Sequence, residues 1–342
     1  MTYTVTVRQW AEPLCVEMGA TILETALVEG RAYPHGCKSG NCGACKSRLT
    51  SGEVQMAPFS EHALSPAEQA AGLILACRAV PWSDCTVAWL EEDELVAHPR
   101  RRLDCRVAGV EPLSHDVTRL RLAIEAGGPY DFAPGQYAEL TLPGLPARDY
   151  SMANGPDDAG LEFHVRAVSD GTVSTTVRER LAVGDPVRVE GPFGIAYWRA
   201  RHDGPVLALA GGSGLAPIKA IVEHALASGF EAPIRLWHGV RGERDVYLED
   251  HIRTLAAAHP NLDYRVVLSE PSGSTARVTG TLADLLVTEP ESLDSARFYL
   301  AGPPVMVESC LARLYNHGVA RENCHADAFY TAAEKARLEM TG

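Results

Sequence analysis

Four cysteines have the spacing of a metal-cluster site. They form a C-x4-C-x2-C segment with one more residue further along the chain: Cys37, Cys42, Cys45 and Cys77. Three thiolates on one tight loop and one from a distant segment can surround two irons, and this is the plant-type 2Fe-2S spacing. Structural zinc usually takes two C-x2-C hooks or a histidine pair, and Cys77 has no companion. The spacing therefore favours a 2Fe-2S cluster over zinc or a chance group of buried thiols.

The glycines beside and between these cysteines would let the loop wrap closely around a cluster: Gly36, Gly40 and Gly43. The segment CKSGNCGACKSRL, with LACR around Cys77, resembles plant-type ferredoxin domains, and this resemblance implies an α+β, β-grasp fold. The other cysteines lack such spacing, and we expect them to be small buried residues: Cys15, Cys85, Cys105, Cys310 and Cys324.

A second group of residues suits a flavin dinucleotide. Arg148, Asp149, Tyr150 and Ser151 are consecutive; arginine offers a planar fork to a diphosphate, and tyrosine offers a flat face to an aromatic ring. Gly171 precedes a predicted helix, whose free N–H groups would favour an anion. Each piece alone is more often a strand end or an ordinary helix cap.

In this order the motifs resemble the ferredoxin–NADP reductase superfamily, which binds FAD in an antiparallel β-barrel. The resemblance implies FAD contacts for the following residues: Arg148, Tyr150, Ser151, His164, Val165, Arg166, Gly171, Val173, Ser174 and Thr175. Asp149 stands where the superfamily more often has Pro or Ser, and in a strand its side chain would face away from the flavin.

The segment VLALAGGSGLAPIKAIV suits the phosphates of a second dinucleotide. Its glycines follow a predicted strand and precede a helix that Pro217 would begin, so the backbone can approach a pyrophosphate. Pro217 takes the place of the third glycine of a Rossmann fingerprint. The superfamily instead has G-G-S/T-G-x-A-P, and the resemblance implies NAD(P) contacts from Gly212, Ser213 and Gly214.

A second superfamily motif, C-G-x-P-x-M, lies beside the nicotinamide. Here it reads AGPPVM, and the resemblance implies nicotinamide contacts from four residues: Ala301, Gly302, Pro303 and Met306. Ala301 replaces the usual cysteine, which implies slower or differently tuned electron transfer. Without the other motifs, this segment would be an ordinary strand-to-helix turn.

Charged residues after the next predicted strand bear on the choice of coenzyme. Arg241 and Arg244 would attract the 2′-phosphate of NADPH, whereas Glu243 and Asp245 would repel it and accept ribose hydroxyls. Arg241 is thus a candidate contact at the adenosine end. The mixture favours NADH and leaves NADPH open.

The C-terminal HADAFY also resembles the superfamily, in which a late aromatic residue covers the flavin and an acid precedes it by two positions. The resemblance implies that Phe329 covers the flavin and that Asp327 manages a proton or hydrogen bond there. With Ser151, these are the candidates near the reacting ring. The alternative for Phe329 is a core aromatic after the last strand.

Three kinds of folding unit are needed to position these residues. Residues 1–93 carry the cluster cysteines, and the charged residues 94–101 are expected to be a linker. In residues 102–201, short alternating strands predict an antiparallel barrel, with strands near 116–124, 136–142, 161–168 and 186–190. In residues 202–342, apolar strands alternate with helices near 217–228, 246–259, 282 and 305–317, which predicts an α/β domain with a parallel sheet.

Composition restricts the partners. The 342 residues include 31 basic and 44 acidic side chains, for a net charge of -13, which argues against nucleic acid or an anionic membrane as partners. No run of 18 apolar residues occurs, and the N-terminus lacks a signal-peptide pattern. We expect a cytoplasmic protein whose clustered cysteines serve metal or redox chemistry rather than disulfides.

Across its whole length the chain resembles the reductase components of bacterial ring-hydroxylating dioxygenases, those of naphthalene and terephthalate systems in particular. The resemblance implies a monomeric oxidoreductase that passes electrons from NADH through FAD and a 2Fe-2S cluster. The acceptor would be a Rieske oxygenase or its ferredoxin. A flavin suits this role because it takes electrons in pairs and releases them singly.

Other interpretations share some of these features. Reductases of di-iron monooxygenases and of deoxysugar (CDP-sugar) dehydration systems have the same domain order and differ in their acceptor. A zinc-stabilised adaptor that binds nucleotide without turnover belongs to another class of protein, and its visible absorption spectrum would be empty.

Overall fold

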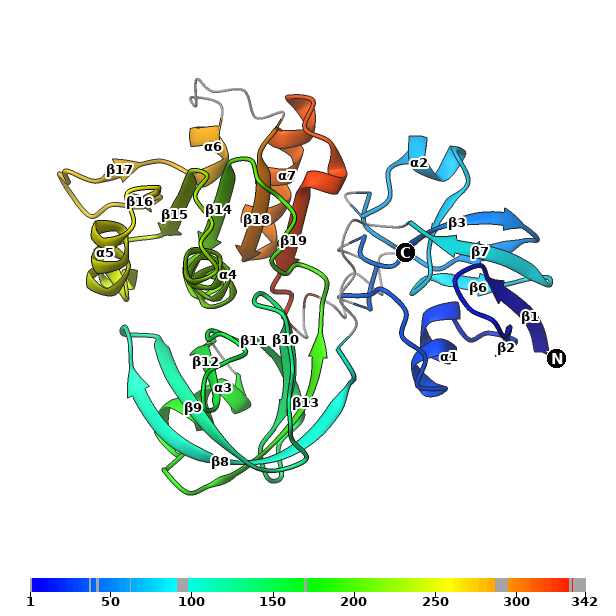
Figure 1. Cartoon of the computed structure of the whole chain (residues 1–342), viewed down its shortest axis with the longest axis horizontal. Coiled ribbons are helices and arrows are strands. Elements are labelled where there is room, and N and C mark those ends of the chain that lie inside the picture. Colours follow the sequence, from blue (N-terminus) through cyan, green and yellow to red (C-terminus); the bar gives the residue numbers. More distant parts are fainter. Residues whose placement is uncertain are drawn as a thin grey trace. The chain divides into compact units, whose positions relative to one another are not determined.

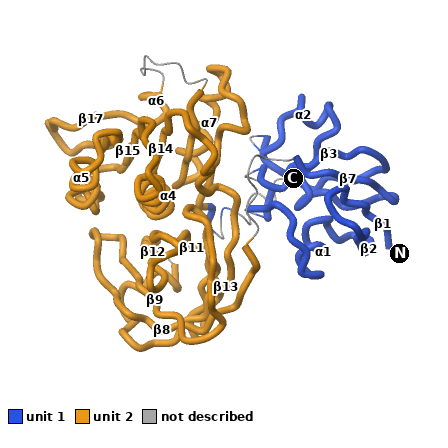
Figure 2. The backbone as a smooth tube through the Cα atoms, viewed as in Figure 1, with its two compact units in different colours: residues 1–97, 330–342 blue, residues 98–329 orange. Residues whose placement is uncertain are grey.

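The computed structural model describes residues 2–36, 38–40, 43–61, 63–90, 98–168, 171–286, 295–331 and 334. The chain forms two compact units, Met1–Ala97 with Tyr330–Gly342, and His98–Phe329 (Figure 2). Two of the predicted cluster ligands, Cys37 and Cys42, lie outside the described residues.

The first unit has the predicted β-grasp fold (Figure 1). Its elements are β1 (Thr2–Val7), β2 (Leu14–Glu17), α1 (Ile22–Val28), β3 (Lys46–Ser51), β4 (Val54–Met56), α2 (Pro66–Ala70), β5 (Leu73–Leu75), β6 (Ala79–Pro81) and β7 (Cys85–Trp89). The main sheet has the order β2-β1-β7-β3-β5, and β1 runs parallel to β7. Alternate residues of β1, Val5 and Val7, are fully buried in the core of this unit, as expected for a strand with one buried face.

The second unit begins with the predicted antiparallel barrel. Its elements are β8 (Arg101–Pro112), β9 (Val117–Ala126), β10 (Tyr137–Thr141), β11 (Arg148–Ser151), β12 (Leu161–Arg166), α3 (Thr172–Glu179) and β13 (Pro186–Phe193). The strand order is β11-β10-β13-β8-β9-β12. An antiparallel bridge between Met152 and Phe163 joins the end of β11 to β12, so the two edge strands meet at a seam that closes the barrel.

The remainder of this unit is the predicted α/β domain. It contains β14 (Val206–Gly211), α4 (Leu215–Ala227), β15 (Ile234–Val240), α5 (Glu249–Ala258), β16 (Leu262–Leu268), β17 (Val278–Thr279), α6 (Leu282–Leu286), β18 (Arg297–Gly302), α7 (Pro304–Asn316) and β19 (Cys324–Ala328). Its parallel sheet has the order β17-β16-β15-β14-β18-β19. The strand order reverses between β14 and β18, and ligands bind parallel sheets at the carboxyl ends of strands at such a switch point.

Two helix starts differ from the sequence expectation. Helix α4 begins at Leu215 rather than Pro217, because a 3-10 turn at Gly212–Gly214 leads directly into it and proline is tolerated in a first turn. Helix α5 begins at Glu249 rather than Val246, because Leu248 has φ of 53°, which interrupts helical geometry.

The expectation that the remaining cysteines are buried is wrong for two of them. Cys85, Cys105 and Cys310 are buried, but Cys15 is exposed and Cys324 is partly exposed. Cys15 occupies an outward position of β2, whose flanking residues Leu14 and Val16 face the core. In the described part of the chain, no helix has the length and apolar character needed to span a membrane.

Candidate functional site

The structure brings together the two cluster cysteines that it describes. Cys45 immediately precedes β3 and Cys77 follows β5, and the pairing of Lys46 with Leu75 places them side by side. Both are buried, and the Cys77 N–H donates to Cys45 Sγ at 3.4 Å. Peptide N–H groups directed at sulfur are the usual surroundings of an iron–sulfur cluster, so these residues fit a cluster.

Gly43 shows how tightly the cysteine loop is packed. It has φ of +73°, and a Cβ atom on it would lie 3.0 Å from the carbonyl oxygen of Ala63. A larger residue would require both a strained backbone and a displaced neighbour. Glycine at position 43 therefore allows the loop that precedes Cys45 to pack closely against Ala63.

The predicted flavin residues lie on two strands that meet at the barrel seam. Arg148, Tyr150 and Ser151 form β11, and His164 to Arg166 end β12. Arg148 is exposed, while burial raises the pKa of Tyr150 to about 12, so its phenol is neutral at physiological pH. An exposed guanidinium beside a half-buried neutral ring fits a flavin dinucleotide.

Two of the predicted flavin contacts have side chains elsewhere. Val165 and Val173 are buried in the barrel core, so a flavin would meet only their backbone. Ser174 is also engaged: its hydroxyl donates to the Gly171 carbonyl at 3.1 Å and accepts from the Val168 N–H at 3.3 Å. Gly171, the N-cap residue of helix α3, makes no side-chain cap; as far as the described residues show, the N–H groups of the first turn suit an anion.

His164 connects the barrel with the α/β domain. Its Nε2 lies 3.1 Å from Glu162 Oε1, and its Nδ1 lies 3.3 Å from the hydroxyl of Tyr247. Burial lowers the pKa of His164, so the ring is neutral near pH 7. Tyr247, which the sequence analysis did not select, is buried between His164 and His238.

The two glycine motifs of the α/β domain form one surface at the switch point. A Cβ atom on Gly214 would lie only 2.0 Å from the carbonyl oxygen of Ala301, so this approach of β18 to the first turn requires glycine. A Cβ atom on Gly211 would likewise lie too close to the side chains of Met306 and Pro303. His238 Nε2 lies 3.2 Å from the Gly212 carbonyl, and burial lowers its pKa to about 4. The bare backbone fits a dinucleotide phosphate.

The C-terminal residues reach the flavin strand. Ser151 Oγ donates to Asp327 Oδ2 at 3.2 Å, which places Asp327 on β19 beside β11. The Phe329 N–H donates to the Gly302 carbonyl at 2.9 Å, and its half-buried ring packs on the core of the α/β domain. The segment thus joins the barrel seam to the switch point.

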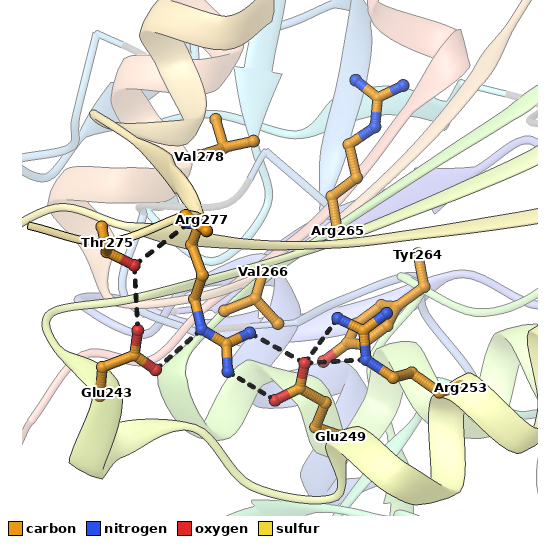
Figure 3. Close-up of a pocket in the computed structure, with 10 residues that line it drawn as sticks. Glu243, Glu249, Arg253, Tyr264, Arg265, Val266, Thr275, Arg277 and Val278 are labelled. Carbon is orange, nitrogen blue, oxygen red and sulfur yellow. Dashed lines mark hydrogen bonds and ion pairs between the residues drawn. The ribbon is translucent and has the colours of Figure 1, made fainter.

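The expected adenosine end contains a charged pocket of about 500 Å³ (Figure 3). Arg277 donates to both carboxylate oxygens of Glu249, and to Glu243, at 2.8 Å each. The hydrogen bonds from Arg277 lower the pKa of Glu249 to about 2. Arg241 and Arg244 are exposed. Sequence reasoning missed Arg277 because its partners lie in distant segments.

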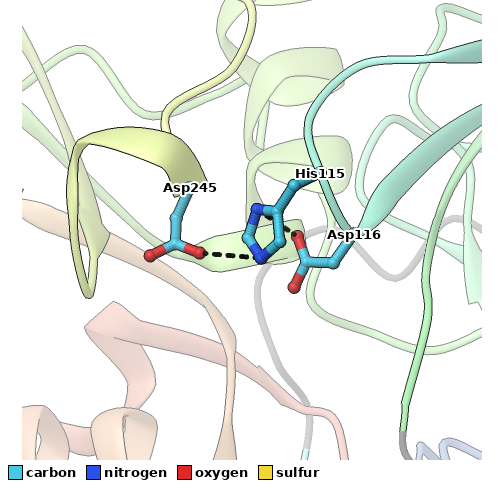
Figure 4. Close-up of side chains that lie close together, drawn as sticks. All are labelled: His115, Asp116 and Asp245. Atoms are coloured by element: carbon cyan, nitrogen blue, oxygen red, sulfur yellow. Dashed lines mark ion pairs between the residues drawn. The ribbon is translucent and has the colours of Figure 1, made fainter.

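Asp245 does not face this pocket. One of its oxygens accepts from the Gly242 N–H at 2.8 Å, and the other lies 3.6 Å from Nε2 of His115, on the barrel (Figure 4). His115 also lies 3.7 Å from Asp116, which accepts from Arg166 at 2.7 Å. Asp245 therefore fixes a turn through one oxygen and lies beside His115 of the barrel through the other.

Three family models match successive parts of the chain. They describe a 2Fe-2S iron-sulfur cluster binding domain at residues 7–81, an oxidoreductase FAD-binding domain at 104–198 and an oxidoreductase NAD-binding domain at 208–311. The three cofactors inferred from the motifs are thus confirmed, and they coincide with the β-grasp domain, the barrel and the parallel sheet.

Relatives match over nearly the full length. The ferredoxin–NAD(P)+ reductase component of naphthalene 1,2-dioxygenase/salicylate 5-hydroxylase systems from Ralstonia sp. is 39% identical over 93% of this chain and 95% of its own. The reductase component of propane 2-monooxygenase from Mycolicibacterium goodii is 33% identical over 93% and 95%. A cytochrome P450 reductase crystal structure from Amycolatopsis superposes with a TM-score of 0.78, at 35% identity over 97% of this chain and 100% of that one.

Proposed function

This chain belongs to the family of ferredoxin–NAD(P)+ reductase components of oxygenase systems, and we propose that its acceptor is a Rieske oxygenase or the ferredoxin that serves one. It is an NAD(P)H-dependent oxidoreductase with FAD and a 2Fe-2S cluster. The observation that supports transfer between the two bound nucleotides is the Ser151–Asp327 hydrogen bond. It holds the strand of the flavin motif beside the last strand of the nucleotide-binding sheet.

FAD held by β11 and by the first turn of α3 would supply the conversion between the electron pair of NADH and the single electrons that a 2Fe-2S cluster accepts. Each turnover converts one NADH and two one-electron acceptors into NAD+, two reduced acceptors and one proton. The Ser151 hydroxyl and the Asp327 carboxylate can hold or move that proton. The neutral His164 ring and the Arg166–Asp116 pair fix β12 on the opposite side of the seam.

A dioxygenase partner is favoured by the 39% identity to the naphthalene dioxygenase component, against 33% for the propane monooxygenase component. The second candidate, a di-iron monooxygenase partner, rests on that lower but full-length match. The test is reconstitution of NADH-dependent hydroxylation, in which purified reductase is mixed with a Rieske oxygenase and its ferredoxin, or with a di-iron hydroxylase. Turnover with only the hydroxylase would contradict the dioxygenase assignment.

NADH is the proposed coenzyme. In the pocket of Figure 3, the guanidinium of Arg277 is engaged by Glu243 and Glu249, so its charge is already compensated. A 2′-phosphate brought close to Glu243 would meet a carboxylate, and like charges placed together are unfavourable. Comparison of kcat/KM for NADH and NADPH is the measurement, and a preference for NADPH would contradict the assignment.

The remaining proposals concern organisation. We propose domain bounds of 1–93, 94–101, 102–201 and 202–342, although Arg101 already lies in β8. The described cysteines form no disulfide, which suits the reducing cytoplasm, the proposed location. The proposed monomer is tested by sedimentation.

For the cofactors, we expect a visible spectrum of flavin and 2Fe-2S that bleaches with NADH under anaerobic conditions. A protein that NADH does not bleach would overturn the proposal.

A further inference from the structure

Lys219 is a buried charge on a helix whose neighbouring inward side chains are apolar. Only 7% of the residue is exposed. Its Nζ donates to the Ala153 carbonyl at 2.9 Å and pairs with Glu223 Oε2 at 2.8 Å. Nζ also lies 4.0 Å from Glu162 Oε1. Burial of an ammonium group is costly unless it is paired, and removal of a buried cation leaves its oxygen partners without that donor. The structure keeps a lysine here, and its contacts indicate what it does.

These contacts lie at the seam of the barrel. The Ala153 N–H donates to the Glu162 carbonyl at 2.8 Å, next to the bridge between Met152 and Phe163. The carbonyl of the same residue, Ala153, receives Lys219. One ammonium group thus reaches β12, through Glu162, and the segment that follows β11, through Ala153, where the two strands of the flavin motif join.

The Glu162 side chain extends this contact. It lies 3.1 Å from Nε2 of the buried His164 and 3.6 Å from Nε of Arg119. Burial alone would raise the pKa of Glu162, but the hydrogen bond with His164 and the charge of Lys219 lower it below its ordinary value. Glu162 is therefore ionised near neutral pH, and the seam presents an anion toward the helix that carries Lys219.

The other end of the connection is the nucleotide-binding turn. Helix α4 begins at Leu215, directly after Gly212–Gly214, and Lys219 lies within its second turn. Since helical hydrogen bonds make the first turns stiff, the position of Lys219 also sets the position of the glycine turn. That turn contacts Ala301 and Gly302 of β18.

We propose that Lys219 is a positioning residue, which holds the nucleotide-binding turn at a fixed distance from the flavin-binding strands. This inference rests on the proposed transfer of electrons from NADH to FAD. Lys219 touches neither reacting ring in this scheme. It acts through the Ala153 carbonyl on one side and through α4 on the other. A displacement of about 1 Å between reacting groups can cost about 100-fold in rate.

The test compares Lys219→Met, Lys219→Arg and the control Arg106→Met, which breaks an exposed ion pair with Glu125 on the barrel. Anaerobic stopped-flow gives the limiting rate of flavin reduction and the dissociation constant for NADH. For Lys219→Met we expect a limiting rate at least about tenfold lower, with the dissociation constant changed less than about threefold. The kinetic isotope effect with 4-deuterated NADH should change as well. Lys219→Arg should recover part of the rate, and Arg106→Met should match the wild type.

A second readout does not depend on activity. Thermal unfolding of the flavin-free chain should show a lower transition temperature for Lys219→Met than for Arg106→Met, because the partly buried carboxylates of Glu162 and Glu223 each lose one partner. This measurement decides the matter if Lys219→Met fails to retain FAD. Equal transition temperatures, or an unchanged limiting rate in a variant that keeps its flavin, would overturn the inference. If NADH fails to reduce the wild-type flavin, it is instead the proposed function that fails.

Discussion

Ser151 Oγ lies 3.2 Å from Asp327 Oδ2, although 176 positions separate the two residues in the sequence. The hydrogen bond joins the last residue of β11 to β19, which is the last strand of the second unit in the sequence. It is the contact through which two motifs recognised separately, RDYS and HADAF, become one site. In the proposed function, this hydroxyl and carboxylate would hold a proton for the flavin.

We expect Ser151→Ala to lower the rate of flavin reduction by NADH about 100-fold, since proton management contributes at this level. Asp327→Asn should have a similar effect, and the double variant should lose little more, because the two groups act as one unit. Stopped-flow reduction at saturating NADH measures this. Ser228→Ala, which removes an exposed hydroxyl that donates to His224, is the matched control. Fully additive losses would contradict the pairing.

The cluster assignment predicts a separation of two activities. Cys45→Ser should remove the 2Fe-2S absorption and the NADH-dependent reduction of cytochrome c, while NADH still reduces the flavin. Cys85 is a buried thiol of the same unit whose pKa burial raises to about 11, and it serves as the control. Cys85→Ala should retain the cluster spectrum. Loss of the cluster in both variants would indicate general unfolding instead.

Coenzyme choice should respond to Glu243. In Glu243→Gln, Arg277 loses one of its carboxylate partners and the pocket loses a negative charge. We expect the ratio of kcat/KM for NADPH to that for NADH to rise about tenfold, or roughly 1.4 kcal/mol. Glu125→Gln, which removes an exposed carboxylate of the barrel, should leave the ratio unchanged. An unaltered ratio in Glu243→Gln would mean that the 2′-phosphate binds elsewhere.

Glu249 should make stability depend on pH in the acidic range. Arg277 holds its pKa at about 2, below the ordinary 4.5. The stabilisation is therefore fully present above about pH 4.5 and is lost as pH falls toward about 2. Transition temperatures of wild type and Glu249→Gln should differ at pH 6 and converge on acidification. A difference that grows at lower pH would contradict the ion pair.

Arg199 predicts a large loss of stability. It is fully buried, and its guanidinium donates to the carbonyls of Tyr197 and Ile195 at 3.0 and 2.8 Å. Arg199→Met would leave both carbonyls without these donors, at a cost of about 3 kcal/mol. Arg106→Met should cost less than about 1 kcal/mol, as is usual for an exposed ion pair. Urea unfolding, followed by tryptophan fluorescence, measures both variants.

The sequence predicted the three architectures because periodicity and turn residues are local properties. The alternation in β8 and β9 and the apolar run of β14 lie in the chain itself. The contact of Cys45 with Cys77 followed from cluster spacing alone. Family motifs indicated Ser151 and Asp327, although nothing local showed that they would touch.

Other features could not be predicted because they depend on tertiary contacts between distant segments. In the sequence, Lys219 is a single charged residue in an apolar helix. Only the fold shows that its ammonium group donates to the Ala153 carbonyl and to Glu223. That interruption of LAPIKAIV was the one available signal. The hydrogen bond from the Gly242 N–H to the Asp245 side chain depends on the conformation of the turn and was likewise not predicted. The predicted start of α5 at Val246 was wrong because Leu248 has a left-handed backbone conformation.

The order of the strands also determines when this protein can begin to work during its own synthesis. The switch point is formed by β14 and β18, and Ser151 bonds Asp327 of β19. Both β18 and β19 lie near the end of the chain. Domains made early fold first on the ribosome, and the strands of the β-grasp domain and of the barrel are made before β18 and β19. A nascent or prematurely ended chain that stops before Cys324 lacks Asp327. Such a chain cannot form the hydrogen bond between Ser151 and Asp327, nor pair β19 with β18.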